Sequence, residues 1–202
     1  MLRKITPFGK LFFDEVAAID LYNTFYANFR IETEVCQCCK STGNCCVHGY
    51  YKRNLIDYFN GKIKTIRILV LRIVCNTCGH THAVLPDILV PYAQHTVRFI
   101  IRVVTEKLTS TLAIEAICEK FDITYKTLYR FLEIYREHKA LWLGVLKSIE
   151  TPLGQFMPIL CTYECFSDFM SVFSKRFGFS FMQRHANPAN SRQRHTEHMY
   201  EA

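Results

Sequence analysis

The stretch that organises the chain runs from Cys36-Gln37-Cys38-Cys39 to Cys75-Asn76-Thr77-Cys78-Gly79-His80. Each end holds a CxxC pair, whose short loop lets two sulfurs face one point. Four thiolates at this spacing suit a tetrahedral Zn²⁺ ion, for which Zn–S bonds are about 2.3 Å. The sequence therefore predicts one structural zinc ion, bound by Cys36, Cys39, Cys75 and Cys78.

Other cysteines and histidines nearby leave alternatives open. Cys38, Cys45 and Cys46 lie in the same region, so Cys36/Cys38 or Cys39/Cys45 are alternative metal-binding pairs for the first half of the site. A histidine can replace one sulfur in a Cys₃His site, and the candidates are His48, His80 and His82. A histidine near a knuckle is, however, more often a surface residue or a hydrogen-bond partner of a ligand than a ligand itself. The structural alternative is a set of buried free thiols without a metal.

The segment between the two cysteine pairs predicts a β-hairpin. Asn60-Gly61 favours a type I′ turn, because both residues tolerate a positive φ. A strand is expected over 46–58, and a return strand rich in β-branched residues over 63–74. The return strand alternates irregularly, so a buried helix stays an alternative there. A third strand is expected at Thr81–Leu85, with Pro86 ending it.

The hairpin and the two cysteine pairs belong to one predicted part of the chain, and one part is expected before it and three after it. Residues 1–30 predict an N-terminal helix, over about 8–28, and residues 31–92 form the zinc ribbon. Pro86 and Pro91 mark the boundary to an all-helical region over 93–150. The predicted fold class is therefore α+β, with a small β-hairpin zinc ribbon followed by an all-α helix-turn-helix region.

The helical region has the proportions of a helix-turn-helix. An apolar stripe from Val97 to Leu108 predicts a first helix, and Thr109-Ser110-Thr111 is expected to break it and cap the next. A short helix follows over 114–121. Asp122-Ile123 makes a tight turn, and Thr124 is the expected N-cap of a longer third helix.

Basic and polar residues on the hairpin and the third helix indicate nucleic acid as a partner. The 202-residue chain carries a formal net charge of +7, which favours polyanions. Residues at the start of a recognition helix can contact bases and phosphates. The alternative is a solvated helix and strand surface. The candidate DNA-binding residues are Lys52, Arg53, Lys62, Lys64, Thr124, Tyr125, Lys126, Thr127, Tyr129 and Arg130.

Residues 151–182 are rich in phenylalanine and predict a C-terminal helix. Phe166, Phe169, Met170, Phe173 and Phe177 fit one helical face. If the rest of the chain does not cover this face, it is a candidate homodimer surface. The polar tail over 183–202 is predicted to be disordered.

The ten cysteines are expected to be reduced. The basic start of the chain is interrupted by Asp14, Glu15 and Asp20, unlike an export signal. The longest apolar run, Ile66 to Val74, is too short to span a bilayer. We therefore expect a cytoplasmic location, where paired CxxC motifs indicate a metal rather than disulfides.

Three segments together resemble a bacterial zinc-ribbon family of unknown function. They are Cys36-Gln37-Cys38-Cys39-Lys40-Ser41-Thr42-Gly43, His48-Gly49-Tyr50-Tyr51-Lys52-Arg53 and Val74-Cys75-Asn76-Thr77-Cys78-Gly79-His80-Thr81-His82-Ala83-Val84-Leu85-Pro86. Such ribbons look like the N-terminal zinc-binding and helix-turn-helix region of insertion-sequence transposases. The resemblance implies zinc ligation by Cys36, Cys39, Cys75 and Cys78, and DNA as the partner.

The chain departs from a transposase after the helix-turn-helix. A transposase needs three acidic residues that hold two metal ions, whereas Glu150, Glu164 and Asp168 lie in no strand–helix pattern. We therefore expect a zinc-dependent DNA-binding regulator or accessory factor that is not an enzyme. The alternative is a zinc-ribbon adaptor that binds proteins. Neither hypothesis involves a membrane or a small-molecule substrate.

Overall fold

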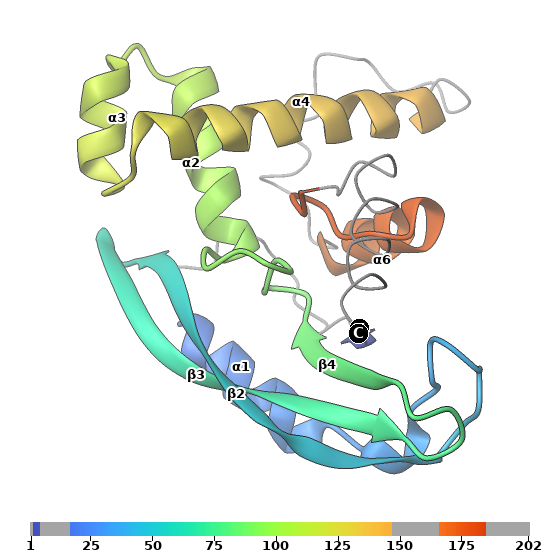
Figure 1. The fold of residues 1–202 in the computed structure, drawn as a ribbon. Coiled ribbons are helices and arrows are strands. Elements are labelled where there is room, and N and C mark those ends of the chain that lie inside the picture. The colour runs from blue at the N-terminus through green and yellow to red at the C-terminus, as the bar shows by residue number, and fades with distance from the viewer. Residues whose placement is uncertain (1, 5–16, 147–165, 185–202) are drawn as a thin grey trace, which may run out of the picture.

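The computed structural model describes residues 2–4, 17–146 and 166–184, which form a mixed α+β fold (Figure 1). The predicted α+β class is confirmed. The strands are β1 (Leu2–Lys4), β2 (Cys45–Phe59), β3 (Lys62–Cys75) and β4 (Thr81–Pro86). The helices are α1 (Ala18–Asn28), α2 (Val97–Thr109), α3 (Ile114–Lys120), α4 (Tyr125–Leu146) and α6 (Phe166–Phe177), with a 3₁₀ turn, η1, at Ile31–Thr33.

The predicted hairpin is confirmed as the long pair β2 and β3. The two strands are antiparallel and in register from Cys45 opposite Cys75 to Phe59 opposite Lys62, with one register shift between Val47 and Gly49. At the tip, Asn60 and Gly61 have φ angles of 51° and 73°, as a type I′ turn requires. The predicted third strand is also present, as β4, and Pro86 is its last residue.

The N-terminal segment differs from the prediction. The sheet order is β1-β4-β3-β2, and β1 pairs in parallel with β4, a strand that the sequence did not predict. The helix expected over about 8–28 begins only at Ala18, because Ala17 has an extended backbone with ψ of 150°. Residues 5–16 lie outside the described residues.

Strand β3 is buried on both faces along its second half. Ile68 and Val70 point into a core shared with the helices, whereas Leu71, Ile73 and Cys75 pack in a second cluster with α1 and the cysteines. In Figure 1, α1 lies along the hairpin, and the hydroxyl of its Tyr22 donates to the carbonyl of Leu69. A strand buried on both sides needs apolar residues at successive positions, which explains the irregular alternation in the sequence.

Helices α2, α3 and α4 follow as predicted, with one difference at a cap. Thr124 is the N-cap of α4, since its Oγ1 accepts from the N–H of Thr127 at 3.2 Å. Asp122, in the preceding turn, has a φ of 45°. The expected cap at Thr109-Ser110-Thr111 is wrong, because Ala113 is the N-cap of α3 and Ser110 instead ends α2.

No helix within the described ranges combines the length and the apolar character that crossing a bilayer requires.

The hairpin and the helices share one core across the expected boundary at residues 92 and 93. The Arg53 guanidinium donates to the carbonyls of Val90, at 2.5 Å, and Ala93. Deeper inside, the carboxylate of Asp57 forms an ion pair with Arg98 and accepts from the Thr96 hydroxyl at 2.7 Å. These bonds fix the direction in which α2 leaves the sheet.

Helix α6 packs against α4 through aromatic side chains. The His138 ring of α4 lies 5.2 Å from that of Phe173, and Phe169, Met170 and Phe173 are buried. A homodimer surface was expected only if the rest of the chain left this apolar face uncovered. These three side chains are covered by the chain itself, so they do not form such a surface. A dimer through other residues of the segment stays a prediction. Residues 147–165 and 185–202 lie outside the described residues. They include the start of the phenylalanine-rich segment predicted over 151–182 and most of the tail predicted over 183–202.

Candidate metal centre

Two backbone loops of the same construction carry the four predicted cysteines. In the first, the N–H of Cys36 donates to Ser41 O at 2.9 Å, and Lys40 N–H donates to Cys36 O at 2.9 Å. In the second, Cys75 N–H donates to His80 O at 3.0 Å, and Gly79 N–H donates to Cys75 O at 2.8 Å. The bonds join equivalent positions, so the two loops are repeats of one knuckle.

Both knuckles place a residue with positive φ directly after their second cysteine. The φ angle is 63° at Lys40 and 71° at Gly79. This left-handed residue turns the chain back after the cysteine and leaves both sulfurs of a knuckle on the same side. The hairpin then brings the second knuckle opposite the first, because Cys45, close after the first knuckle, pairs with Cys75.

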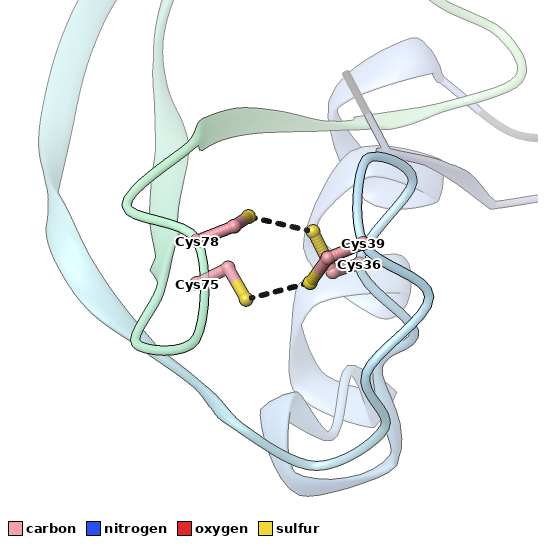
Figure 2. Close-up of side chains that lie close together, drawn as sticks. All are labelled: Cys36, Cys39, Cys75 and Cys78. Carbon is pink, nitrogen blue, oxygen red and sulfur yellow. Dashed lines mark hydrogen bonds between the residues drawn. The ribbon is translucent and has the colours of Figure 1, made fainter.

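The four sulfurs face one another across the gap between the knuckles (Figure 2). The distances Cys36 Sγ–Cys78 Sγ and Cys39 Sγ–Cys75 Sγ are both 3.6 Å, and all four sulfurs lie within 4.8 Å of one another. Four ligands of a tetrahedral zinc ion at about 2.3 Å would be about 3.8 Å apart. The cluster therefore has the size that a metal ion with four thiolate ligands requires.

Hydrogen bonds from neighbouring side chains favour thiolates in this cluster. The Ser41 hydroxyl lies 3.2 Å from the sulfurs of both Cys39 and Cys75. Its hydrogen bond lowers the pKa of Cys39 and lowers that of Cys75 to about 5. Since a metal binds the thiolate and not the thiol, and a hydroxyl has one proton to donate, Ser41 favours the thiolate at Cys39 or at Cys75, one at a time.

His82 supports the cluster from the side of β4. Its Nε2 lies 3.3 Å from Cys36 Sγ, and burial lowers the pKa of the imidazole. A neutral ring with a proton on Nε2 donates to the Cys36 sulfur. The sequence offered His82 either as a substitute ligand or, more commonly for such a histidine, as a surface residue or a partner of a ligand, and nothing in its spacing distinguished these roles.

The remaining candidate ligands fall outside the four-sulfur cluster. Cys45 is buried, and burial raises its pKa. Cys46 Sγ–H donates to Asn76 Oδ1 at 3.2 Å, and His48 is exposed. Cys38 and His80 form a separate group with Cys78, in which the three ligand atoms lie within 4.8 Å of one another.

The predicted DNA-binding residues differ in their exposure. Two of them are partly buried: Arg53, whose guanidinium is bonded to the chain after β4, and Thr127, which belongs to the cap of α4. The other eight are exposed, namely Lys52, Lys62, Lys64, Thr124, Tyr125, Lys126, Tyr129 and Arg130.

Residues 36–131 match the model of one protein family, described as a domain of unknown function (DUF6431). No curated protein and no solved structure matches the chain. The matched segment contains both knuckles, the hairpin, α2, α3 and the first turns of α4, so the candidate metal centre lies entirely within it.

Proposed function

We propose that this chain is a DNA-binding protein in which one structural zinc ion holds the two knuckles together and a helix-turn-helix, formed by α3 and α4, lies beside the hairpin. Zinc is the metal that fits best, because it favours four thiolates in a closed tetrahedral site. The observation that carries the DNA proposal is the position of exposed cations on two neighbouring elements.

The first of these elements is the hairpin. Lys52, Lys62, Lys64 and Arg67 are exposed on β2 and β3. Asp57, the one acidic residue in these two strands, is 1% exposed and paired with Arg98. The hairpin therefore carries positive charge that no carboxylate of its own strands offsets. The strand register places Lys62 and Lys64 on one face, and Lys52 and Arg67 on the other.

The second element is the start of α4. Tyr125, Lys126, Tyr129 and Arg130 are exposed on its first turns, whereas Leu128 and Phe131 are buried in the core. Lysine and arginine at these positions can contact phosphates or guanine edges.

The tip of the hairpin lies next to the turn between α3 and α4 (Figure 1). The ring of Tyr58, one residue before the last of β2, is 5.2 Å from that of Phe121, which ends α3. Lys62 and Lys64 therefore lie on the side of the molecule where α4 begins. The Asp57–Arg98 ion pair joins the hairpin to α2, and the Tyr58–Phe121 contact joins its tip to the end of α3, directly before α4. Two basic elements held close together suit contact with one duplex.

The test is a titration of a DNA duplex with the zinc-loaded protein at several salt concentrations. We expect affinity to fall steeply with salt, since each neutralised phosphate adds about 0.9 to the slope of log K against log salt. The variants Lys62→Gln/Lys64→Gln and Lys126→Gln/Arg130→Gln should each reduce this slope by roughly 1 to 2. The control is Lys175→Gln/Arg176→Gln, which removes two exposed cations from the last turn of α6.

Absence of binding to any duplex, or an affinity that does not depend on salt, would refute the DNA proposal. Equal slopes for all three double variants would show that the hairpin and α4 are not the contact surface.

A protein-binding adaptor is the second candidate, because apolar side chains are exposed on the hairpin. Tyr50 is 62% and Leu69 is 53% exposed, and the strand register makes them diagonal neighbours on one face. A chain that binds no DNA but co-elutes with a protein through this face would favour the adaptor. The variant Tyr50→Ser/Leu69→Ser should then abolish that co-elution.

We propose no catalytic role, and we place the protein in a reducing compartment such as the cytoplasm. All eight cysteines in the part of the chain that the structure describes are free. Cys46, which is followed by a histidine two residues later, donates to Asn76 and is not paired with that histidine as a nucleophile would be with its base.

A further inference from the structure

A second group of metal ligands lies next to the four-cysteine cluster and shares one residue with it. The ligand atoms of Cys38, Cys78 and His80 lie within 4.8 Å of one another. Cys38 and His80 are exposed and Cys78 is half-buried, whereas Cys36 and Cys75 are buried. The second group is thus the more exposed of the two, although Cys39 of the first group is exposed as well.

One nitrogen of the His80 ring is held by the backbone of its own knuckle. Its Nδ1 lies 3.2 Å from the carbonyl oxygen of Cys78. A carbonyl can only accept, so Nδ1 carries the proton of this hydrogen bond and Nε2 keeps its lone pair. Metal-binding histidines are commonly fixed in this way, with one ring nitrogen donating to a backbone carbonyl and the other facing the ion.

The repeat of the two knuckles explains why His80 lies at this position. His80 in the second knuckle is equivalent to Ser41 in the first, since each accepts the N–H of the first cysteine of its own knuckle. The Ser41 side chain contacts sulfurs of the cluster on one side. The equivalent position on the other side holds an imidazole, which can bind an ion where a hydroxyl only donates a hydrogen bond.

Charge also favours a second cation beside the first. Four thiolates around one divalent ion leave a net negative charge at the cluster. A metal ion at the second group would bind Cys38 as a further thiolate. The Cys78 sulfur retains lone pairs after binding one ion, so it can bridge to another. A second divalent cation at Cys38, Cys78 and His80 would offset most of this excess charge.

We propose that Cys38, Cys78 and His80 form a second metal site, which takes a thiophilic divalent cation such as Zn²⁺ or Cd²⁺ with Cys78 as a bridging thiolate. Cys38 and His80 are its terminal ligands, and water completes its coordination. Because this site is exposed and has three protein ligands, it binds more weakly than the four-cysteine site and exchanges its ion more readily. The proposal does not depend on DNA binding.

The experiment counts the ions bound to the untagged full chain by native mass spectrometry during titration with Cd²⁺. The test variant is Cys38→Ser/His80→Gln. The matched control is Cys46→Ser/His48→Gln, which removes an exposed thiol and an exposed imidazole from the same ribbon but outside both groups. Histidines in the tail are present in all three proteins and cancel in the comparison.

We expect the wild type and the control to take up one ion more than the test variant, while all three keep the same far-UV circular dichroism spectrum. Cadmium NMR of the wild type should show two signals that are coupled through the shared sulfur. Equal numbers of ions in the wild type and the test variant would overturn the second site, and two uncoupled signals would overturn the bridge.

If the double variant does not fold, the single variants Cys38→Ser and His80→Gln decide the question. Each should weaken the second binding step by at least about tenfold and leave the first unchanged. Single variants that bind both ions as tightly as the wild type would contradict the proposal.

Discussion

Lys40 and Gly79 occupy the same left-handed position in the two knuckles, but only one of them is a glycine. A residue with a side chain loses about 1–2 kcal/mol in this conformation, whereas glycine costs about 0.5–1 kcal/mol in chain entropy. A Cβ at Gly79 would meet nothing within 4 Å, so a substitution there tests conformation without a clash.

We therefore expect Gly79→Ala to lower the free energy of unfolding by about 1 kcal/mol and Lys40→Gly to raise it slightly or leave it unchanged. The measurement is urea denaturation of the metal-loaded protein. A loss of stability in both variants would show that Lys40 contributes more through its Nζ bond to Gln37 O than it loses through its backbone.

His95 makes stability depend on pH. Burial, and then the charge of Arg130, lower its pKa to about 4, and its ring stacks 4.8 Å from Phe99. The folded protein thus holds this imidazole neutral, while the unfolded chain protonates it near pH 6.5. Its contribution to stability is complete above pH 6.5 and is lost as the pH falls towards 4.

Lowering the pH from 7 to 5 should therefore destabilise the wild type by about 1–2 kcal/mol more than His95→Gln. The comparison uses urea unfolding at both pH values with the metal bound. The same pH dependence in both proteins would mean that folding does not lower the pKa of His95.

At the scale of elements, local signals in the sequence predicted the hairpin because Asn60-Gly61 and the β-branched return strand act on their immediate neighbours. The knuckles were predictable for the same reason, since each CxxC pair lies within four residues. Strand β1 was not, because its pairing with β4 joins residues about 80 positions apart. Likewise, no local pattern distinguishes Arg53, which is bonded to Val90 and Ala93, from the exposed lysines nearby.

The start of α4 offers a test of one predicted element. Thr124→Ala removes the side-chain acceptor of the Thr127 N–H and should cost about 1 kcal/mol. Thr111→Ala is the control, because Thr111 is exposed in the loop before α3 and caps neither helix. Thermal unfolding of the two variants checks this, and an equal decrease in Tm would argue against the cap.

At the scale of the whole molecule, the hairpin has two different anchors. Its knuckle end packs in a small cluster with α1, in which Cys36, Cys45 and Cys75 are members. Its tip half contributes Leu55, Ile68 and Val70 to the larger core of the helices. The small cluster contains few apolar side chains, so it depends on the metal more than the larger core does.

Removal of the metal should therefore unfold the knuckle end before the tip half. Hydrogen exchange after chelation should show early loss of protection at the amides of Ile73 and Cys75, with protection retained at Leu55 and Val104. Simultaneous loss at all four amides would indicate that the metal holds the entire fold. Unchanged exchange after verified metal removal would exclude a structural metal.

The tyrosines of α1 have a consequence for self-association. Strand β4 pairs with β3 over Arg72–Val74, so Leu69 lies beyond this pairing, where its carbonyl faces the Tyr22 hydroxyl. The Tyr26 hydroxyl, at 2.6 Å, likewise caps the carbonyl of Val84 on β4. Unpaired carbonyl and N–H groups along the edge of a β-sheet can form hydrogen bonds with a strand of another chain. The phenols of α1 occupy the carbonyls of Leu69 and Val84, so these two acceptors are not available to an added strand.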